Sequence, residues 1–181
     1  MSVVDLINYT YEDYKNWEGD WELIEGLPVS MAPAPMKIHQ QLSRDIAMEL
    51  AQNECKLCEL LYEVDWKICE ETVVRPDIVF TCDDEGEAYL TKAPKIIVEI
   101  LSPSTARKDE TVKFDLYEAE GVQYYLLVYP DDLKAKAYTL KEGKYRKIGD
   151  FTHETLTFEE LPCDLEIDFA KVFTKYRKKR A

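Results

Sequence analysis

Two acidic residues lie inside apolar segments of the chain, where an uncompensated charge is costly. Asp77 follows Pro76 and precedes the run Ile-Val-Phe, and Glu99 lies within the run Ile-Ile-Val-Glu-Ile-Leu at 96–101. A carboxylate among such residues requires a compensating partner. A shared hard cation is one such partner, because Mg²⁺ takes oxygen ligands and often only one or two protein carboxylates. The alternative is a structural ion pair between each acid and an Arg or Lys.

A basic helix is predicted directly after Glu99. Arg107, Lys108 and Lys113 lie on this helix or at its start, and Lys113 shares one face with Tyr117 because they are four residues apart. A lysine directed at the two carboxylates would stabilise the charge that develops on a phosphate and orient a metal-bound water. The alternative for Lys113 is a solvated surface lysine.

Two further polar residues are candidates for the same site. His39, one of two histidines, begins a predicted helix, where it would bind phosphate or adjust a water near neutral pH. A surface or capping group is the alternative for His39. Asp65 lies on a strand that precedes Asp77 and is a candidate for an outer position, whereas Trp66 is expected in the core.

The periodicity of the chain predicts a mixed α/β sheet with helices on both sides. Residues 36–53 form an amphipathic helix, with Ile38, Leu42, Ile46, Leu50 and, on the flank, Met48 on one face. Residues 96–128 are predicted to form a strand–helix–strand crossover whose single helix runs to about Glu120 and stops at Gly121. The remaining elements are a short helix at 10–16, strands at 21–24, 27–31, 60–68, 73–81, 135–140 and 144–148, and a short strand with a basic helix or tail at 161–181.

Length and composition indicate one soluble domain. The 181 residues are 46% hydrophobic and 33% charged, which is typical of a globular chain. No apolar run approaches the ~20 residues that span a bilayer, and the first 14 residues lack the apolar segment of a signal peptide. We therefore expect a cytoplasmic protein without a membrane partner. The expected domain covers 1–181, with a core at about 10–150 and a basic tail at about 171–181.

The net charge of −13 is unevenly distributed. Residues 1–90 have 6 basic and 20 acidic residues, a net of −14, whereas residues 91–181 have 17 and 16, a net of +1. A global acidic field repels nucleic acid, so a surface that faces phosphate would have to come from the second half. Its candidates are Lys92, Lys95, Arg107, Lys108, Lys113, the stretch 134–147 and the tail 175–180.

The five cysteines are Cys55, Cys58, Cys69, Cys82 and Cys163. Their odd number and the absence of an export signal predict reduced thiols. The Cys55-x-x-Cys58 spacing is compatible with the start of a zinc site, although no second closely spaced pair follows. Buried small hydrophobic side chains are the alternative.

The chemistry-bearing residues form a pattern that resembles a known family. The pattern comprises Arg75-Pro-Asp77, the run Val-Glu-Ile-Leu-Ser-Pro-Ser-Thr at 98–105, and then Asp109, Lys113, Tyr117 and Gly121-Val122, with Trp-Glu-Leu-Ile-Glu-Gly at 21–26 and His39 upstream. This pattern resembles the Uma-two family of restriction endonucleases, within the PD-(D/E)xK nuclease superfamily. The resemblance implies a restriction-endonuclease-like core, a mixed sheet of four or five strands with flanking helices.

The resemblance also implies roles for individual residues. Asp77 and Glu99 would hold Mg²⁺ or Mn²⁺, and the backbone carbonyl of Ile100 would complete the shell. The superfamily pattern has a lysine two residues after the Glu, where this chain has Leu101; Lys113 on the next helix is the matching position. Outer positions would be taken by His39, Tyr117, and Glu22 or Glu25, although for either Glu an acid at a sheet edge that faces water is the alternative.

Two functions follow as hypotheses. The first is a metal-dependent endonuclease that hydrolyses phosphodiester bonds, with DNA as substrate, a homodimer as the working form and no small-molecule cofactor. The second is a catalytically silent domain of the same fold that binds a protein or nucleic-acid partner, which the acidic charge favours. The three residues Asp77, Glu99 and Lys113 favour the first, because a silent domain is free to lose them.

Overall fold

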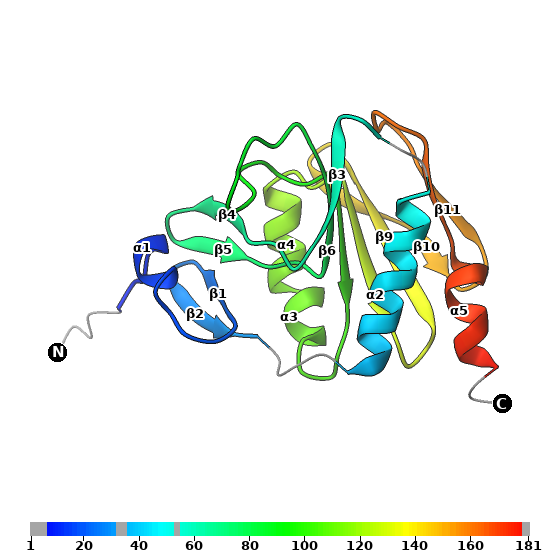
Figure 1. The fold of residues 1–181 in the computed structure, drawn as a ribbon, viewed down its shortest axis with the longest axis horizontal. Coiled ribbons are helices and arrows are strands. Elements are labelled where there is room, and N and C mark those ends of the chain that lie inside the picture. Colours follow the sequence, from blue (N-terminus) through cyan, green and yellow to red (C-terminus); the bar gives the residue numbers. More distant parts are fainter. Residues whose placement is uncertain (1–6, 32–35, 53–54, 179–181) are drawn as a thin grey trace.

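Six strands form the central sheet in the described part of this computed structural model, which covers residues 7–31, 36–52 and 55–178 (Figure 1). The strand order is β10-β9-β8-β7-β6-β3, and all neighbours are antiparallel except β7 and β8. The predicted mixed α/β fold is therefore confirmed, with one strand more than the resemblance implied. The strands are β3 (Cys58–Tyr62), β6 (Ile78–Cys82), β7 (Ile96–Ile100), β8 (Tyr124–Tyr129), β9 (Lys134–Lys141) and β10 (Lys144–Phe151).

The parallel pair β7–β8 is joined through helices, as predicted. The connection consists of two helices, α3 (Ala106–Glu110) and α4 (Val112–Ala119), where the sequence predicts one. The helix is interrupted at Thr111, whose backbone is not helical (φ −127°, ψ −77°). The Thr111 hydroxyl donates a hydrogen bond to the Arg107 carbonyl at 2.6 Å. Such a side-chain bond to the backbone competes with regular helix geometry.

The central sheet is covered on both faces. In β8, Tyr124, Leu126 and Val128 join the cluster that includes α2 (Lys37–Leu50) and α5 (Phe169–Arg177), whereas Tyr125 and Leu127 pack with Tyr117 of α4. Figure 1 shows α2 and the α3–α4 pair on different sides of the central strands. Burial on both faces explains the continuous apolar runs of β7 and β8. Each such side chain contributes about 1.5–3 kcal/mol when fully buried.

A second, smaller sheet packs beside α4. Its order is β2-β1-β5-β4, and helix α1 (Tyr11–Tyr14) precedes it. Ile24, Val74 and Trp66 from this sheet share a buried cluster with Tyr117, so the prediction of Trp66 in the core is confirmed. The strands are β1 (Trp21–Ile24), β2 (Leu27–Ser30), β4 (Trp66–Cys69) and β5 (Thr72–Val74).

Two predicted strands each divide between the two sheets. The run 60–68 divides into parts of β3 and β4, and the run 73–81 divides into parts of β5 and β6. Glu63, with φ 46°, directly follows β3, where the chain leaves the central sheet for the smaller one. Asp77 consequently lies just before β6 and not inside a strand, which corrects the expectation from sequence.

The C-terminal segment packs on the sheet as a hairpin and a helix. The hairpin comprises β11 (Thr155–Phe158), which the sequence did not predict, and β12 (Leu165–Asp168). On α5, Lys175 pairs with Asp45, and Arg177 donates to the Thr152 carbonyl at 2.8 Å. These basic residues thus have intramolecular partners; the part of the predicted tail at 179–181 lies outside the described residues.

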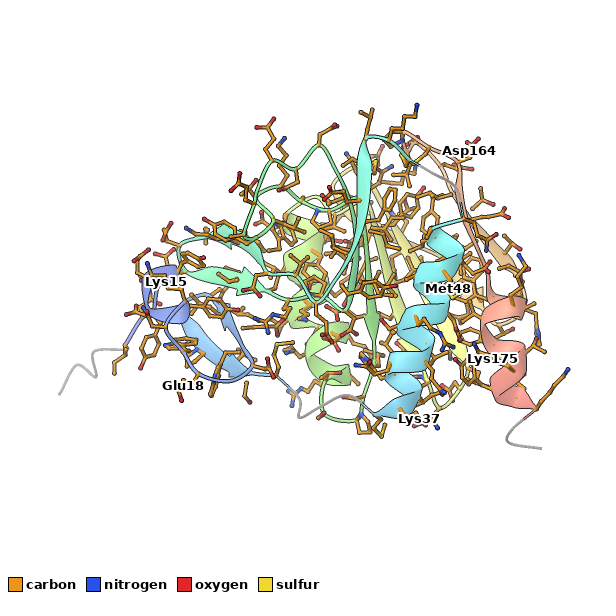
Figure 2. The ribbon with its side chains drawn as sticks, viewed as in Figure 1. Lys15, Glu18, Lys37, Met48, Asp164 and Lys175 are labelled. Atoms are coloured by element: carbon orange, nitrogen blue, oxygen red, sulfur yellow. A yellow bond between two sulfur atoms is a disulfide. The ribbon has the colours of Figure 1, made fainter. Side chains whose placement is uncertain are left out.

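The outer face of α2 is polar apart from one methionine. Leu42, Ile46 and Leu50 are buried as predicted, but Met48 is exposed on the side of α2 that faces solvent (Figure 2). The prediction that Met48 lies on the flank of the apolar face is therefore wrong. Among the described residues, no helix has the length and apolar character needed to cross a membrane.

The cysteines differ from the expectation of reduced thiols. Disulfides join Cys55 to Cys163 and Cys58 to Cys82, and Cys69 is free and exposed. The first pair is separated by 108 residues. The fold brings Cys55 and Cys163 together, and the spacing of cysteines in the sequence could not predict this pairing.

Candidate functional site

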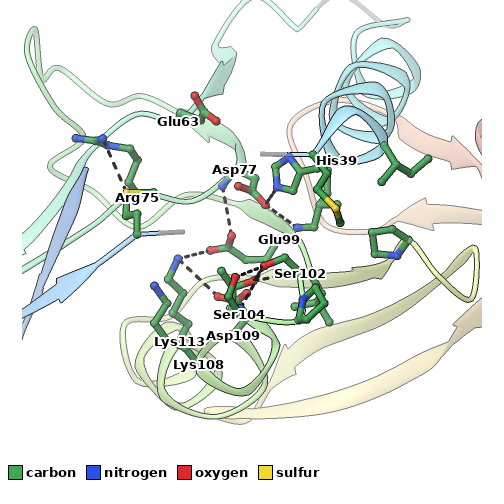
Figure 3. Close-up of a pocket in the computed structure, with 18 residues that line it drawn as sticks. His39, Glu63, Arg75, Asp77, Glu99, Ser102, Ser104, Lys108, Asp109 and Lys113 are labelled. Atoms are coloured by element: carbon green, nitrogen blue, oxygen red, sulfur yellow. Dashed lines mark hydrogen bonds and ion pairs between the residues drawn. The ribbon is translucent and has the colours of Figure 1, made fainter. Parts of the chain in front are cut away.

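A cavity of about 300 Å³ opens beside the C-terminal end of β7 (Figure 3). The Ser-Pro-Ser-Thr segment at 102–105 and the start of α3 form one wall, and residues near the start of α2 form another. Charged side chains of both signs converge here from the two sheets and the helices. Those that line the cavity are Glu63, Asp77, Glu99, Asp109, His39, Arg75, Lys108 and Lys113.

Asp77 is held at the cavity from two sides. Its Oδ2 accepts a hydrogen bond from the backbone N–H of Ile100 at 2.6 Å and lies 3.1 Å from Nε2 of His39. The first contact ties the carboxylate to the end of β7, and the second ties it to α2. Burial opposes the charge on the His39 imidazole, but Asp77 outweighs it and raises the pKa of His39. The Asp77 side chain remains 18% exposed, so it is accessible from the cavity.

Glu99 points from β7 toward α4, because it alternates with Val98 and Ile100 on the opposite face. Its Oε1 accepts hydrogen bonds from Lys113 Nζ at 2.8 Å and from the Tyr117 hydroxyl at 3.0 Å. Burial raises the pKa of the Glu99 carboxyl well above its ordinary value, and the nearby carboxylates add to this although Lys113 opposes it. The charged form of Glu99 is therefore disfavoured unless further positive charge is present.

Glu22 is fully buried, which corrects the alternative of an edge acid that faces water. Its strand β1 lies between β2 and β5. Its Oε1 lies 2.8 Å from Lys113 Nζ, and its Oε2 accepts from Lys108 Nζ at 2.6 Å. Burial alone would raise the pKa of Glu22, but Lys113 and Lys108 together lower it to about 2. Glu22 is therefore ionised and holds both lysines in place.

Lys113 is the central cation of the site. Its ammonium contacts both Glu22 and Glu99, and its side chain is 3% exposed. Burial alone would lower the pKa of Lys113, but the surrounding carboxylates raise it well above the ordinary value. An ammonium has three N–H donors, and these two close contacts use two of them. One donor thus remains for a further acceptor.

Asp109 is a buried site residue to which the sequence reasoning assigned no role. Its carboxylate lies 3.8 Å from Lys113 Nζ, and burial raises its pKa. Asp109, Lys113 and Tyr117 are spaced at intervals of four, which would have indicated a shared helical face. Lys108 was predicted only as a surface cation.

Two other candidates lie apart from this group. Glu25 is exposed in the turn between β1 and β2, where its backbone N–H donates to Thr72 Oγ1 at 3.2 Å. The turn directs the side chain to solvent, so its proposed outer position is wrong. Asp65 accepts from Arg75 Nε at 2.7 Å and from the Tyr14 hydroxyl at 3.0 Å, in a neighbouring network. Leu101, at the superfamily lysine position, is buried in the core.

The charges of the site are suited to a hard divalent cation. Four carboxylates, from Glu22, Asp77, Glu99 and Asp109, lie around two lysines, so acid groups exceed lysines by two. Oxygen-rich sets of this kind are what Mg²⁺ and Mn²⁺ prefer. In addition, the buried Nδ1 of His39 has no hydrogen-bond partner among the described residues.

Comparisons with known proteins identify the family of the chain and agree with its fold. The sequence profile of the Uma2 family, described as "Putative restriction endonuclease", matches residues 10–170. A solved structure from Anabaena variabilis, titled as a "putative nuclease belonging to DUF820", aligns with a TM-score of 0.71 at 17% identity. The alignment covers 91% of this chain and 97% of that chain. No curated protein matches the chain.

Proposed function

Since the chain belongs to the Uma2 family and has a nuclease-like fold, we propose that it is an endonuclease that hydrolyses DNA with Mg²⁺ or Mn²⁺ held by Asp77 and Glu99. The observation that carries this proposal is the convergence of these two carboxylates at an open cavity. The Asp77 backbone N–H donates to Glu99 Oε2 at 3.4 Å, while Asp77 itself remains partly exposed.

The ligand set would comprise one oxygen from each acid and the carbonyl of Ile100. The Ile100 N–H already donates to Asp77, and Ile100 lines the cavity, so the backbone of this residue lies near the carboxylate. When bound, the cation would polarise a phosphate oxygen and lower the pKa of a coordinated water. His39 would act as a positioning residue, because its contact with Asp77 limits the rotation of that carboxylate.

Lys113 would stabilise the negative charge that develops on the phosphate. Its raised pKa keeps the ammonium charged at neutral pH, and Glu22 and Glu99 fix its position. Such a preorganised charge in a desolvated site requires little rearrangement as the reaction proceeds. Lys108, which is partly exposed at the cavity, would contact a neighbouring phosphate.

The test is the nicking of supercoiled plasmid with Mg²⁺ or Mn²⁺. We expect Asp77→Asn and Glu99→Gln to abolish cleavage, and Lys113→Met to slow it by about 10²–10³-fold, the range for loss of one preorganised donor. The matched controls are Asp115→Asn, an exposed acid on α4, and Lys144→Met, an exposed lysine on β10. Both controls should cut at the parental rate.

Calorimetric titration with Mn²⁺ separates metal binding from catalysis. Binding to the parent that is lost in Asp77→Asn supports the ligand assignment. If the parent binds Mn²⁺ and retards DNA in a gel but cuts no substrate, the silent-domain hypothesis replaces the endonuclease. If both acid variants cut as fast as the parent, the site assignment is wrong.

We also propose a homodimer as the form that cuts both strands. Two active sites that act in one binding event convert supercoiled plasmid to linear DNA, whereas a single site produces nicked circles first. Analytical ultracentrifugation of the protein with and without a DNA duplex tests this directly. A monomer under both conditions would contradict the proposal.

A further inference from the structure

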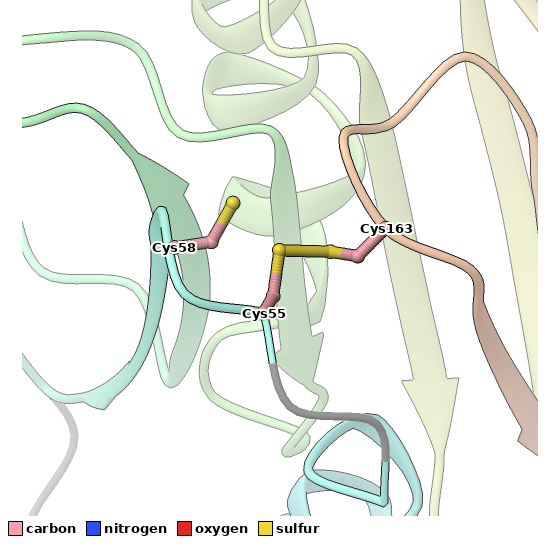
Figure 4. Close-up of side chains that lie close together, drawn as sticks. All are labelled: Cys55, Cys58 and Cys163. Atoms are coloured by element: carbon pink, nitrogen blue, oxygen red, sulfur yellow. A yellow bond between two sulfur atoms is a disulfide. The ribbon is translucent and has the colours of Figure 1, made fainter.

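Four of the five cysteines lie at one end of the central sheet: Figure 4 shows Cys55, Cys58 and Cys163 close together, and Cys82 is bonded to Cys58. Cys58 begins β3 and Cys82 ends β6, whereas Asp77 lies just before the opposite end of β6. A five-residue strand spans about 17 Å, so the cysteines are separate from the carboxylate cavity. Cys55 comes from the segment after α2, and Cys163 comes from the connection between β11 and β12.

The sulfur atoms lie at distances suited to one shared ion. Those of Cys55, Cys58 and Cys163 all lie within 4.8 Å of one another. The fourth, from Cys82, is directly opposite Cys58 on the neighbouring antiparallel strand and is bonded to it. A tetrahedral zinc site with Zn–S bonds of ≈ 2.3 Å places its sulfurs about 3.8 Å apart. Three of the sulfurs are thus already within reach of one ion, and once the Cys58–Cys82 bond is reduced, rotation of the Cys82 side chain would bring the fourth.

Disulfide pairing alone does not explain why both pairs occupy the same place. Each disulfide requires two neighbouring cysteines, but it places no demand on the position of a second disulfide. Here Cys58 lies beside both Cys55 and Cys163, to which it is not bonded (Figure 4). A set of four thiolates around one cation requires this mutual proximity.

We propose that Cys55, Cys58, Cys82 and Cys163, in the reduced state, bind one Zn²⁺ ion. Each thiol loses its proton on binding, so the complete site has a net charge of −2. Cys82 is buried in the core, whereas the other three are partly exposed, so an ion can enter from solvent. Four protein ligands leave no open position for a substrate, so the role of the ion is structural.

This zinc site would join segments that are distant in the chain. It would connect the end of α2 and the β11–β12 connection to the edge strand β3 and its neighbour β6. The start of α2 carries His39, which contacts Asp77 in the carboxylate cavity. Zinc would thus stabilise the layer of the fold that holds α2, independently of whether the cavity hydrolyses DNA.

The experiment uses the full chain, reduced with an excess of a phosphine reductant and then freed of metal. Zn²⁺ is added, excess ion is removed, and bound zinc is measured by mass spectrometry of the metal. We expect one ion per chain in the parent and in Cys69→Ser, whose cysteine lies outside the cluster. If Asp77→Asn binds as much zinc as the parent, the bound zinc is not held by the carboxylates of the cavity. Cys55→Ser and Cys163→Ser should lose most of the bound zinc.

A second measurement needs no cysteine variant and therefore does not depend on variant folding. Zn²⁺ should protect four cysteines of the reduced parent from alkylation while Cys69 reacts, as peptide mass spectrometry can show. Substitution of Co²⁺ should produce the absorption bands of tetrahedral thiolate coordination. If reduced parent binds no zinc, or if zinc binds without protection of these four cysteines, the proposal is overturned and the cysteines function only as disulfide pairs.

Discussion

Glu22 and Glu99 are both buried and both contact Lys113, yet their pKa values shift in opposite directions. For Glu22, burial is outweighed by two lysines, Lys113 and Lys108, and the pKa falls to about 2. For Glu99, burial dominates, and the charges of neighbouring acids add to it. Glu22 therefore has a structural role as an ionised anchor, whereas Glu99 lacks sufficient positive charge, which a bound cation would supply.

This difference predicts opposite effects of two isosteric substitutions on stability without metal. Glu99→Gln should raise the melting temperature in a chelator, because it removes a carboxyl whose ionisation is opposed by burial and by the neighbouring acids. Glu22→Gln should destabilise the protein by about 3 kcal/mol, because it leaves the Lys108 and Lys113 charges with one partner fewer. Thermal and urea unfolding measure both effects. A Glu99→Gln variant that is less stable than the parent would contradict this account.

The contribution of Glu22 to the free energy of unfolding should depend on pH. Its folded pKa of about 2 lies below its ordinary value of 4.5, so its stabilisation is complete above about pH 4.5. That contribution is lost as the pH falls from about 4.5 to 2. The stability difference between parent and Glu22→Gln should therefore shrink over this range, and a constant difference would indicate that charge is not its cause.

At the scale of elements, the break between α3 and α4 allows two lysines to reach one carboxylate. Lys108 and Lys113 are five residues apart, which places them about 140° apart around a continuous helix. The non-helical backbone at Thr111 changes the relation between the two helices, and both ammonium groups contact Glu22. One continuous helix, as the sequence predicts, would not direct both lysines toward Glu22.

The end of α4 depends on a glycine. Gly121 has φ 84°, and an added Cβ would meet no atom within 4 Å, so only backbone strain opposes a side chain there. We expect Gly121→Ala to destabilise the protein by about 1 kcal/mol while the cleavage rate stays unchanged. Gly149→Ala in β10 is the control, because its φ is not positive and its Cβ would make only ordinary contact with Phe151. Equal stability losses in urea would argue against strain at Gly121.

At the scale of the whole molecule, the charge of −13 would restrict where the proposed DNA substrate can bind. The lysines of the β9–β10 region, a candidate phosphate surface, form ion pairs with acids. The cations at the cavity are paired as well, but the cavity also has the carboxylates that are proposed to hold a metal ion. The cations at the cavity are Arg75, Lys108 and Lys113, and His39 adds a fourth when it is protonated. We therefore expect a local binding surface at the cavity and not an extended one.

The salt dependence of DNA affinity tests this restriction. With about three phosphate contacts, the logarithm of the affinity should fall with the logarithm of the salt concentration at a slope of about −3 or shallower. Fluorescence anisotropy measures the slope with a labelled duplex and the Asp77→Asn variant, which we expect not to cleave the duplex. A slope steeper than about −5 would place DNA on a second basic surface.

Much of the fold could be predicted because its strongest signals are local. The apolar period of 37–50, the continuous runs of β7 and β8, and the Gly121 stop all depend on residues close together in the chain. Asp77 and Glu99, two of the carboxylates at the cavity, could be identified for the same reason, since an acid within an apolar run is conspicuous. Their proposed roles in metal binding and catalysis remain predictions.

The sequence by itself thus determined most of the elements, the mixed sheet and the family pattern, whereas the tertiary structure decided where predicted elements divide and which charges are paired. The strand Trp-Glu-Leu-Ile does not reveal that Glu22 is buried, because its partner Lys108 lies 86 residues later. The same holds for Cys55 and Cys163. Burial and ion pairing depend on contacts between distant segments, and only the packing of α3, α4 and the two sheets brings those segments together.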